Sequence, residues 1–202
     1  MERYRRRYPL FFKVCGITNF EDARIARDSG ASIIGVVLSD LSPRKGSREL
    51  VMELKEYGMN VASVYTDMET CLKYDSGEDY AQLHFPNTAQ DIDRIREDGR
   101  KIISVIDVDR EVIESVTMKE RTRKADLVLL ESRSGISGKM QDIRSFLNEK
   151  VGVAGKINPE NIRKIIDYHP GFVDASSGLE AYPGKKDALK IRNFFREAGY
   201  GK

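Results

Sequence analysis

Short apolar runs rich in β-branched residues alternate with segments of helical spacing along the entire chain. The runs that predict strands are residues 11–15, 32–38, 61–66, 80–84, 101–107, 125–130, 151–155 and 171–176. Strands separated by helices must pair in parallel, because a return to the same edge of a sheet takes about a dozen residues or more. Eight such units in 202 residues predict the α/β class and, within it, a single compact (β/α)8 TIM barrel with short loops.

Apolar residues three or four positions apart mark the helical segments between these runs. They are Met68, Cys71 and Leu72; Ile92 and Ile95; Val112, Ile113 and Val116; Ile143, Phe146 and Leu147; Ile162, Ile165 and Ile166; and Ile191, Phe194, Phe195 and Ala198. Two start signals agree with the pattern. Thr18 with Glu21 predicts a capping box, and Asn158 before Pro159 predicts an N-cap followed by proline at the first helical position.

The rival fold is an open, doubly wound sheet, and the missing GxGxxG after the first strand argues against it. No composition break or linker divides the chain, and 40% hydrophobic residues suffice for one core. We therefore expect one barrel domain over residues 1–202, with residues 1–9 as a basic arm. Two interpretations of the arm's arginines are open, contact with RNA or a frayed and solvated terminus; they are Arg3, Arg5, Arg6 and Arg7.

Charge and the lack of targeting signals leave the cytoplasm as the expected location. With 34 basic and 32 acidic side chains, the net charge of +2 gives no reason to expect a nucleic-acid or membrane partner. Lys13 interrupts the first apolar run, which argues against a signal peptide there, and no run approaches the length of a membrane span. Two cysteines and two histidines on unrelated spacings predict no metal site and reduced thiols. The oligomeric state is left open.

Unusual residues collect where the predicted strands end, which is where barrels carry their active sites. They are Cys15 after the first strand, Arg44 in the loop after the second, His84 after the fourth, Asp107 after the fifth, Glu131 after the sixth, Gly155 and Lys156 after the seventh, and Asp174 to Gly178 at the eighth. Asp126, by contrast, begins the sixth strand and so belongs at the opposite end of the barrel.

The last two loops predict a phosphate site. Small residues let backbone N–H groups approach an anion closely, and barrels often hold phosphate in these two loops. The predicted residues are Gly155, Lys156, Ser176, Ser177 and Gly178. Glycine and serine also simply make turns, but their presence in both loops favours phosphate. Lys156 either adds an ammonium to this site or points into solvent.

Six motifs together resemble the phosphoribosylanthranilate isomerase family of tryptophan biosynthesis: "KVCGIT", "SPR", "QLH", "SGK", "AGKINPEN" and "VDASSGLEAYPGKKD". They occur in the family's order and cover nearly the whole chain. The resemblance implies an Amadori rearrangement of N-(5-phosphoribosyl)anthranilate to 1-(2-carboxyphenylamino)-1-deoxyribulose 5-phosphate, without cofactor or metal. A carboxylic acid after the sixth strand opens the furanose ring, and the cysteine after the first strand removes the C2 proton.

The resemblance also assigns the site residues. Cys15 is the general base and Glu131 the general acid, in the place where the family has aspartate; Asp107 is the backup acid. Arg44 is expected to pair the anthranilate carboxylate through its planar fork and to lower the thiol pKa. Asp174 is expected to bind substrate. His84 is expected to form an active-site wall, although a structural histidine is an equal alternative.

Two alternatives to this function come from the same residues. One is the related aminoaldose–ketose isomerase of histidine biosynthesis, which uses two aspartates and resembles two half-barrels; Cys15 and the missing half repeat argue against it. The other is a phosphosugar-binding barrel impaired by Glu131, because its extra methylene moves the carboxyl by about 1.5 Å and a shift of about 1 Å can cost ~100-fold in rate. Cys71, on a helix face, is expected to be a small buried hydrophobe.

Overall fold

The computed structural model describes residues 8–74, 76–97 and 99–200. In this part of the chain eight parallel strands close a barrel in sequential order, and the last strand pairs with the first. They are β1 (Phe11–Val14), β2 (Ile33–Val37), β3 (Val61–Tyr65), β4 (Tyr80–Leu83), β5 (Lys101–Asp107), β6 (Leu127–Glu131), β7 (Val151–Ala154) and β8 (Phe172–Ala175). The predicted strands and the barrel are confirmed. The arginines of the basic arm, Arg3 to Arg7, lie outside the described residues.

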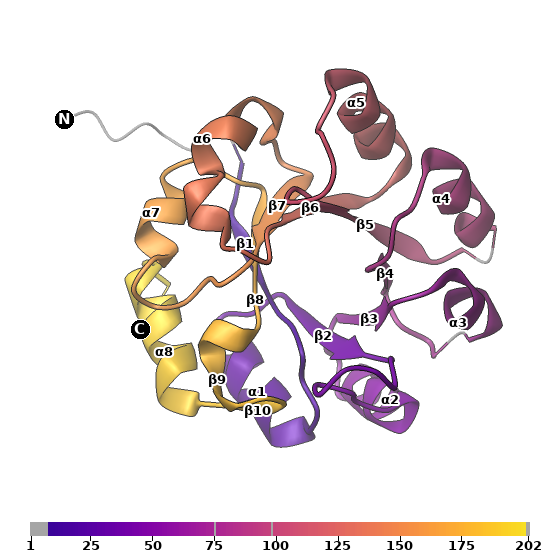
Figure 1. Ribbon diagram of the computed structural model, residues 1–202. Helices are drawn as coiled ribbons and strands as arrows, with labels where there is room; N and C mark the ends of the chain where they lie inside the picture. Colours follow the sequence, from indigo (N-terminus) through magenta and orange to yellow (C-terminus); the bar gives the residue numbers. More distant parts are fainter. Residues whose placement is uncertain (1–7, 75, 98, 201–202) are drawn as a thin grey trace.

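The helices form a ring around the strands (Figure 1). They are α1 (Phe20–Ser29), α2 (Arg48–Glu56), α3 (Met68–Lys73), α4 (Ala89–Arg96), α5 (Ser115–Lys124), α6 (Met140–Ile143), α7 (Ile162–Ile166) and α8 (Ala188–Glu197), with short 3-10 turns at Ile136–Gly138, Arg144–Phe146 and Ser177–Leu179. Between β8 and α8 the chain adds a two-stranded hairpin, β9 (Glu180–Tyr182) and β10 (Lys185–Lys186), which lies near α1. None of the described helices is long and apolar enough to cross a membrane.

Alternate residues of each strand face two different cores. In β1, Phe12 packs edge-on against Phe194 and Phe195 of α8, in the layer between strands and helices. The opposite side chains face the barrel interior, where an apolar cluster built around Ile103, Leu129 and other strand residues fills one end. Because side chains alternate along a strand, Lys13 lies on this interior face together with Cys15.

Two predictions about helix starts are wrong. The cap of α1 is Asn19, whose side-chain oxygen accepts from the Asp22 N–H, and not Thr18 with Glu21. Thr18 instead donates its hydroxyl to the Gly184 carbonyl, a long-range contact that local sequence does not reveal. Asn158 accepts hydrogen bonds from two N–H groups of the turn that precedes α7, but the helix itself begins only at Ile162.

The helical face predicted from Val112, Ile113 and Val116 is also wrong. The first two precede α5, which begins at Ser115, and Val112 and Val116 are largely exposed. The helix buries Met118 and Arg121 instead. The guanidinium of Arg121 can be buried because Asn87 and Ser104 accept its hydrogen bonds. Cys71 is fully buried on α3, as predicted.

Candidate active site

A cavity of 360 Å³ opens at the carboxyl ends of the strands. It brings together nine of the predicted residues: Cys15, Arg44, His84, Glu131, Gly155, Lys156, Asp174, Ser176 and Ser177. Gly178 and Asp107 are not among its lining residues. Nine further residues line it that were not predicted as site residues, and Gln82 and Arg133 are two of the polar ones. Gln82 is buried, and its amide oxygen has no hydrogen-bond partner among the described residues, so a polar acceptor is available inside the cavity.

Cys15 follows β1 and is held by its backbone N–H, which donates to the Ala175 carbonyl at 2.9 Å. The thiol is buried, with 8% of the residue exposed, but lines the cavity. Gly16 then turns the chain with a φ of 73°, a conformation that favours glycine. A side chain there would stand 2.8 Å from the Arg44 Cδ and 3.0 Å from the Ser176 Oγ. The glycine therefore leaves room for two neighbouring loops.

A buried ion pair lies beside the thiol. Lys13 is fully buried and its ammonium donates to Asp174 Oδ2 at 2.9 Å. The other carboxylate oxygen of Asp174 is buried without a hydrogen-bond partner among the described residues. Because an unpaired buried oxygen is costly, this atom is poised to accept a hydrogen bond from a ligand hydroxyl in the cavity.

The electrostatics of Cys15 differ from the prediction. Burial raises the pKa of the thiol above its ordinary value, and Lys13 opposes this rise more strongly than any other charge, with Lys186 contributing less. Arg44, expected to lower the thiol pKa, is not among the main influences on it. The reason is position, because the Arg44 guanidinium is directed at another residue.

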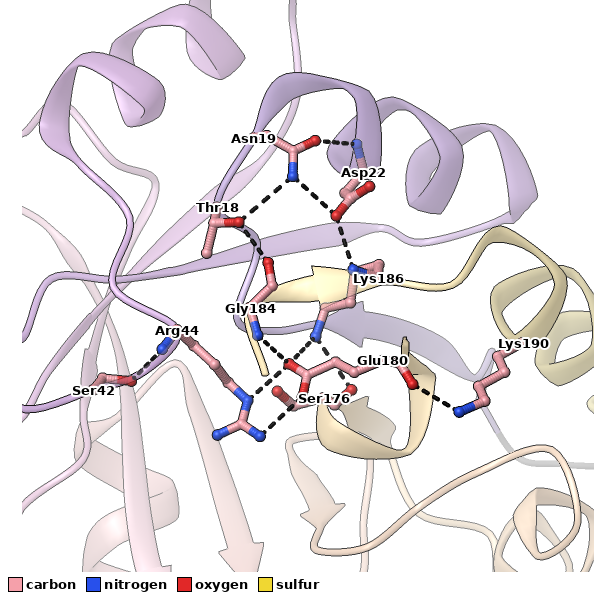
Figure 2. A network of polar contacts seen from close by, with 10 residues as sticks. All are labelled: Thr18, Asn19, Asp22, Ser42, Arg44, Ser176, Glu180, Gly184, Lys186 and Lys190. Atoms are coloured by element: carbon pink, nitrogen blue, oxygen red, sulfur yellow. Dashed lines mark hydrogen bonds and ion pairs between the residues drawn. The ribbon is translucent and has the colours of Figure 1, made fainter. Parts of the chain in front are cut away.

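That residue is Glu180 at the start of β9. Arg44 donates from Nε to Oε1 at 2.8 Å and from Nη2 to Oε2 at 2.9 Å, so one edge of the planar fork is used within the protein (Figure 2). A guanidinium carries five N–H donors, and three of them, on Nη1 and Nη2, are left for a ligand. Arg44 can therefore still pair a carboxylate, but through the end of the fork and in an orientation that Glu180 sets.

The β9–β10 hairpin links three loops of the cavity mouth (Figure 2). Lys186 donates its ammonium to Glu180 Oε1 at 3.0 Å and to the Ser176 carbonyl at 3.2 Å. Its backbone N–H donates to Asp22 at the start of α1. The loops after β1, β2 and β8 are thus held together by charged hydrogen bonds, which fixes the surroundings of Cys15.

Glu131 ends β6 on the same cavity and has an unusual protonation equilibrium. Burial, with the negative charge of Asp174 nearby, raises the pKa of its carboxyl to about 7. Its closest ionisable partner is His84, whose Nε2 lies 3.3 Å from Oε2. Burial lowers the pKa of His84, so the imidazole is mainly neutral at pH 7 and its proximity does not force Glu131 to ionise.

The loop after β6 is anchored to the loop after β5. Ser134 donates its backbone N–H to Asp109 at 2.9 Å, and the Ser132 hydroxyl donates to the same carboxylate at 3.0 Å. Asp107, the predicted backup acid, lies near Arg110 and Arg133 at 3.7 and 3.9 Å, outside the 360 Å³ cavity. Glu131 is therefore the carboxyl better placed to act on a molecule bound beside Cys15.

The two predicted phosphate loops meet at one side of the cavity. Ser177 and Lys156 are exposed there, and their backbone N–H groups have no acceptor among the described residues. The glycines have a packing role: a side chain at Gly155 would stand 1.9 Å from the Ser132 carbonyl oxygen, and one at Gly178 would stand 2.0 Å from the Ile157 carbonyl oxygen. Lys156 has a φ of 50°, so this loop turns with a lysine in the left-handed region.

Within the described residues, no group of three His, Cys, Asp or Glu side chains is placed to hold a metal ion. Three cations from different loops line the cavity, Arg44, Arg133 and Lys156, together with the carboxyl groups of Glu131 and Asp174. Lys186 lies behind Arg44, where it donates to Glu180. Such a set suits an anionic organic molecule.

Comparisons with known proteins agree on one family. A family model described as N-(5'-phosphoribosyl)anthranilate (PRA) isomerase matches residues 12–197. The N-(5'-phosphoribosyl)anthranilate isomerase of Thermoplasma volcanium is 43% identical over 186 residues, covering 92% of this chain and 94% of that protein. The crystal structure of phosphoribosyl anthranilate isomerase from Thermotoga maritima superposes with a TM-score of 0.78 at 28% identity, covering 95% of this chain and 99% of that one.

A further isomerase structure, a complex with reduced 1-(o-carboxyphenylamino)-1-deoxyribulose 5-phosphate, superposes equally well, with a TM-score of 0.78, 28% identity and coverage of 95% of this chain and 99% of that one. The family model spans the barrel from β1 to α8, and all residues that line the cavity of this chain lie within the match. This chain belongs to the phosphoribosylanthranilate isomerase family.

Proposed function

We propose that this chain catalyses the Amadori rearrangement of N-(5-phosphoribosyl)anthranilate to 1-(2-carboxyphenylamino)-1-deoxyribulose 5-phosphate in tryptophan biosynthesis, with Glu131 as general acid and Cys15 as general base. The observation that carries the proposal is a carboxyl with a pKa of about 7 and a thiol on one cavity, from strands β6 and β1. An acid must hold its proton near the working pH, and burial gives Glu131 that property.

The proposed reaction has two proton transfers. Glu131 donates a proton to the furanose ring oxygen as the C1–O bond breaks, and the nitrogen lone pair forms a Schiff base. The cationic imine makes the proton on C2 acidic, and the Cys15 thiolate removes it. The electrons of the C–H bond form an enolamine, which tautomerises to the ketone.

The cavity supports one orientation of the substrate. The phosphate lies at the loops of Lys156 and Ser177, whose N–H groups and ammonium suit an anion. The anthranilate carboxylate pairs with the free edge of Arg44. A ribose hydroxyl donates to Asp174 Oδ1. His84 acts as a wall that holds Glu131. With these contacts the partner is a small phosphoribosyl compound, and we further propose that the enzyme acts in the cytoplasm as one barrel domain over residues 1–202.

The test is complementation of a tryptophan auxotroph that lacks the isomerase, combined with an assay of the purified protein. Growth and turnover of the phosphoribosyl substrate support the proposal. Soluble, folded protein that neither complements nor turns over substrate would favour a binding barrel impaired by Glu131. Turnover of the aminoaldose substrate of the histidine pathway in place of this one would favour that isomerase.

The pH dependence of kcat/KM carries a specific prediction. We expect kcat/KM to rise with pH to about 7, to stay level, and to fall only above the raised pKa of Cys15. In the active form Glu131 carries a proton and Cys15 is a thiolate. In the more abundant form Glu131 is ionised and Cys15 carries the proton, so the two forms have the same total charge. The two forms therefore share one pH profile, with limbs set by both groups.

The Glu131→Gln variant identifies the lower limb of this profile. Its residual activity should keep rising through the thiol pKa without a plateau, because only the thiolate then titrates. A plateau retained in the Gln variant would mean that another group sets the lower limb.

Glu180→Gln should raise KM about 10-fold with kcat changed less than about 3-fold, because Arg44 loses the carboxylate that orients its fork. Steady-state kinetics measure both constants. Glu197→Gln, a partly exposed carboxylate on α8, is the matched control and should change neither. A Glu180 variant with unchanged KM would show that Arg44 is oriented by its own loop.

A further inference from the structure

The lysine of β1 holds its charge in the interior of the barrel, where an unpaired ammonium would be costly. Burial alone would lower the pKa of Lys13, but the carboxylate of Asp174 and the Cys15 thiol beside it raise it above the ordinary value. Lys13 is therefore a permanent cation at pH 7. The proposed chemistry gives it no step, since it is neither the acid nor the base and does not line the cavity.

Gly35 of β2 shows how close the ammonium and the thiol are. A Cβ at this position would stand 2.7 Å from Lys13 Nζ and 2.8 Å from Cys15 Sγ. The nitrogen and the sulfur thus both occupy the space that a side chain on the neighbouring strand would fill. A larger residue at this position would displace both groups. Gly35, the one glycine of β2, therefore lies where Lys13 and Cys15 meet.

Forming a thiolate here places a second negative charge next to Asp174 inside the protein. Three other charged groups act on the thiol from neighbouring elements: Asp174 of β8, Lys186 of β10 and Arg44 of the loop after β2. Of the cations, Lys186 and Arg44 are both paired with Glu180. Lys13 differs from them, because its ammonium pairs with Asp174 and also borders the space above Gly35 that the Cys15 sulfur occupies.

We propose that Lys13 is a positioning residue for Cys15: its buried ammonium is shared between Asp174 and the sulfur, and it supplies the counter-charge with which the thiol loses its proton. Asp174 competes with the thiolate for the ammonium. Substrate that donates a hydroxyl to Asp174 weakens this competition and shifts the ammonium toward the sulfur. The base is thereby activated when the sugar is bound, which limits thiolate formation in the empty cavity.

The inference rests on Cys15 as the proposed base, but its test does not use turnover. The rate of alkylation of Cys15 by iodoacetamide, followed against pH without substrate, reports the thiolate fraction. The Cys15→Ala protein gives the background from the fully buried Cys71. Ultraviolet absorbance of the thiolate in a pH titration gives the same quantity without depending on reagent access. Failure of the isomerase assay would leave these measurements intact.

The two members of the ion pair should act in opposite directions. Lys13→Met should slow alkylation at pH 7 by about 10- to 100-fold, because the thiolate loses its counter-charge. Asp174→Asn should accelerate it several-fold, because the thiolate then no longer competes with a carboxylate for the ammonium. Lys119→Met, an exposed lysine on α5, is the control and should change nothing.

Opposite effects cannot come from general loosening of the barrel, which would expose the thiol in both variants. If Lys13→Met fails to fold because Asp174 is left unpaired, the proposal is tested by comparing the alkylation rates of Asp174→Asn and of the double variant Lys13→Met/Asp174→Asn. The double variant should react about 10-fold or more slowly than Asp174→Asn alone. Equal rates in these two proteins, or no acceleration in Asp174→Asn, would overturn the proposal.

Discussion

Glu131→Gln is expected to lower kcat by about 10³-fold while KM changes little, because a well-placed general acid contributes roughly 10²- to 10⁴-fold and the amide has no proton to give. The substitution keeps the size of the side chain and its contact with His84, so the cavity retains its shape. Single-turnover kinetics of ring opening would locate the loss at the first step. Activity within a few-fold of the unmutated protein would remove Glu131 as the acid.

A stability measurement separates this loss from misfolding. Because the pKa of Glu131 is raised to about 7 in the folded protein, the folded state favours the protonated carboxyl. That contribution is fully present below the ordinary pKa of 4.5 and is lost as pH rises through 7. The Gln variant should therefore be more stable than the unmutated protein at pH 8.5, by at most about 3 kcal/mol, and no more stable at pH 4. Thermal unfolding at the two pH values measures this difference.

Glu131→Asp tests the length of the acid. Shortening the side chain retracts the carboxyl by about 1.5 Å from His84 and from the ring oxygen, and we expect a loss of about 10- to 100-fold in kcat. An increase in kcat would instead show that this barrel merely tolerates the longer acid. A ligand-bound structure with the Glu131 carboxyl beyond hydrogen-bond reach of the ring oxygen would contradict the assignment altogether.

Cys15→Ala should also lower kcat by about 10³-fold or more, because removal of the base leaves water as the acceptor of the C2 proton. KM should change little, since the thiol makes no contact with the phosphate or carboxylate sites. Exchange of the C2 proton with solvent, followed by mass spectrometry, measures the step directly. Growth of the auxotroph supported by Cys15→Ala would refute the base.

Cys71→Ala is the matched control for this variant. It removes the same group from the other cysteine, on α3, which is fully buried and is not among the residues that line the cavity. Activity should stay within about 3-fold, and the cost should appear as stability, about 1 kcal/mol for a small buried group. Equal losses of activity in both variants would indicate a general effect of cysteine removal.

The fold was predictable because its signal repeats eight times. Each strand is a short β-rich run, and parallel pairing follows from the helices between the runs. The same logic located Cys15 and Glu131, since parallel strands present their carboxyl ends on one face. The pattern could not predict contacts between residues far apart in the sequence. Thr18 contacts Gly184 and Arg44 contacts Glu180, both in or beside the β9–β10 hairpin. No local sequence signal predicts where this hairpin lies.

The burial of Lys13 was not predicted, although the sequence contains the information that indicates it. Lys13 served only as an argument against a signal peptide, and a lysine is far more often solvated than buried in a barrel. Two facts would have changed the prediction: the strand alternation that points Lys13 to the same side as Cys15, and an acid at the equivalent place in the last strand, Asp174. The error for Val112 has the opposite origin, since its apolar side chain belongs to an exposed loop.

The hairpin after β8 has an entropic consequence. Arg44, Lys186 and the loops that carry them are ordered by Glu180 and Asp22 of the chain itself, so their rotamers and backbone are restricted in advance of substrate. A receptor prepared in this way loses little conformational freedom when it binds a dianion, and the main cost of association becomes removal of water from the phosphate and carboxylate. The affinity of these loops for an anionic substrate should therefore depend strongly on ionic strength, and ordering of the loops should contribute little to its temperature dependence.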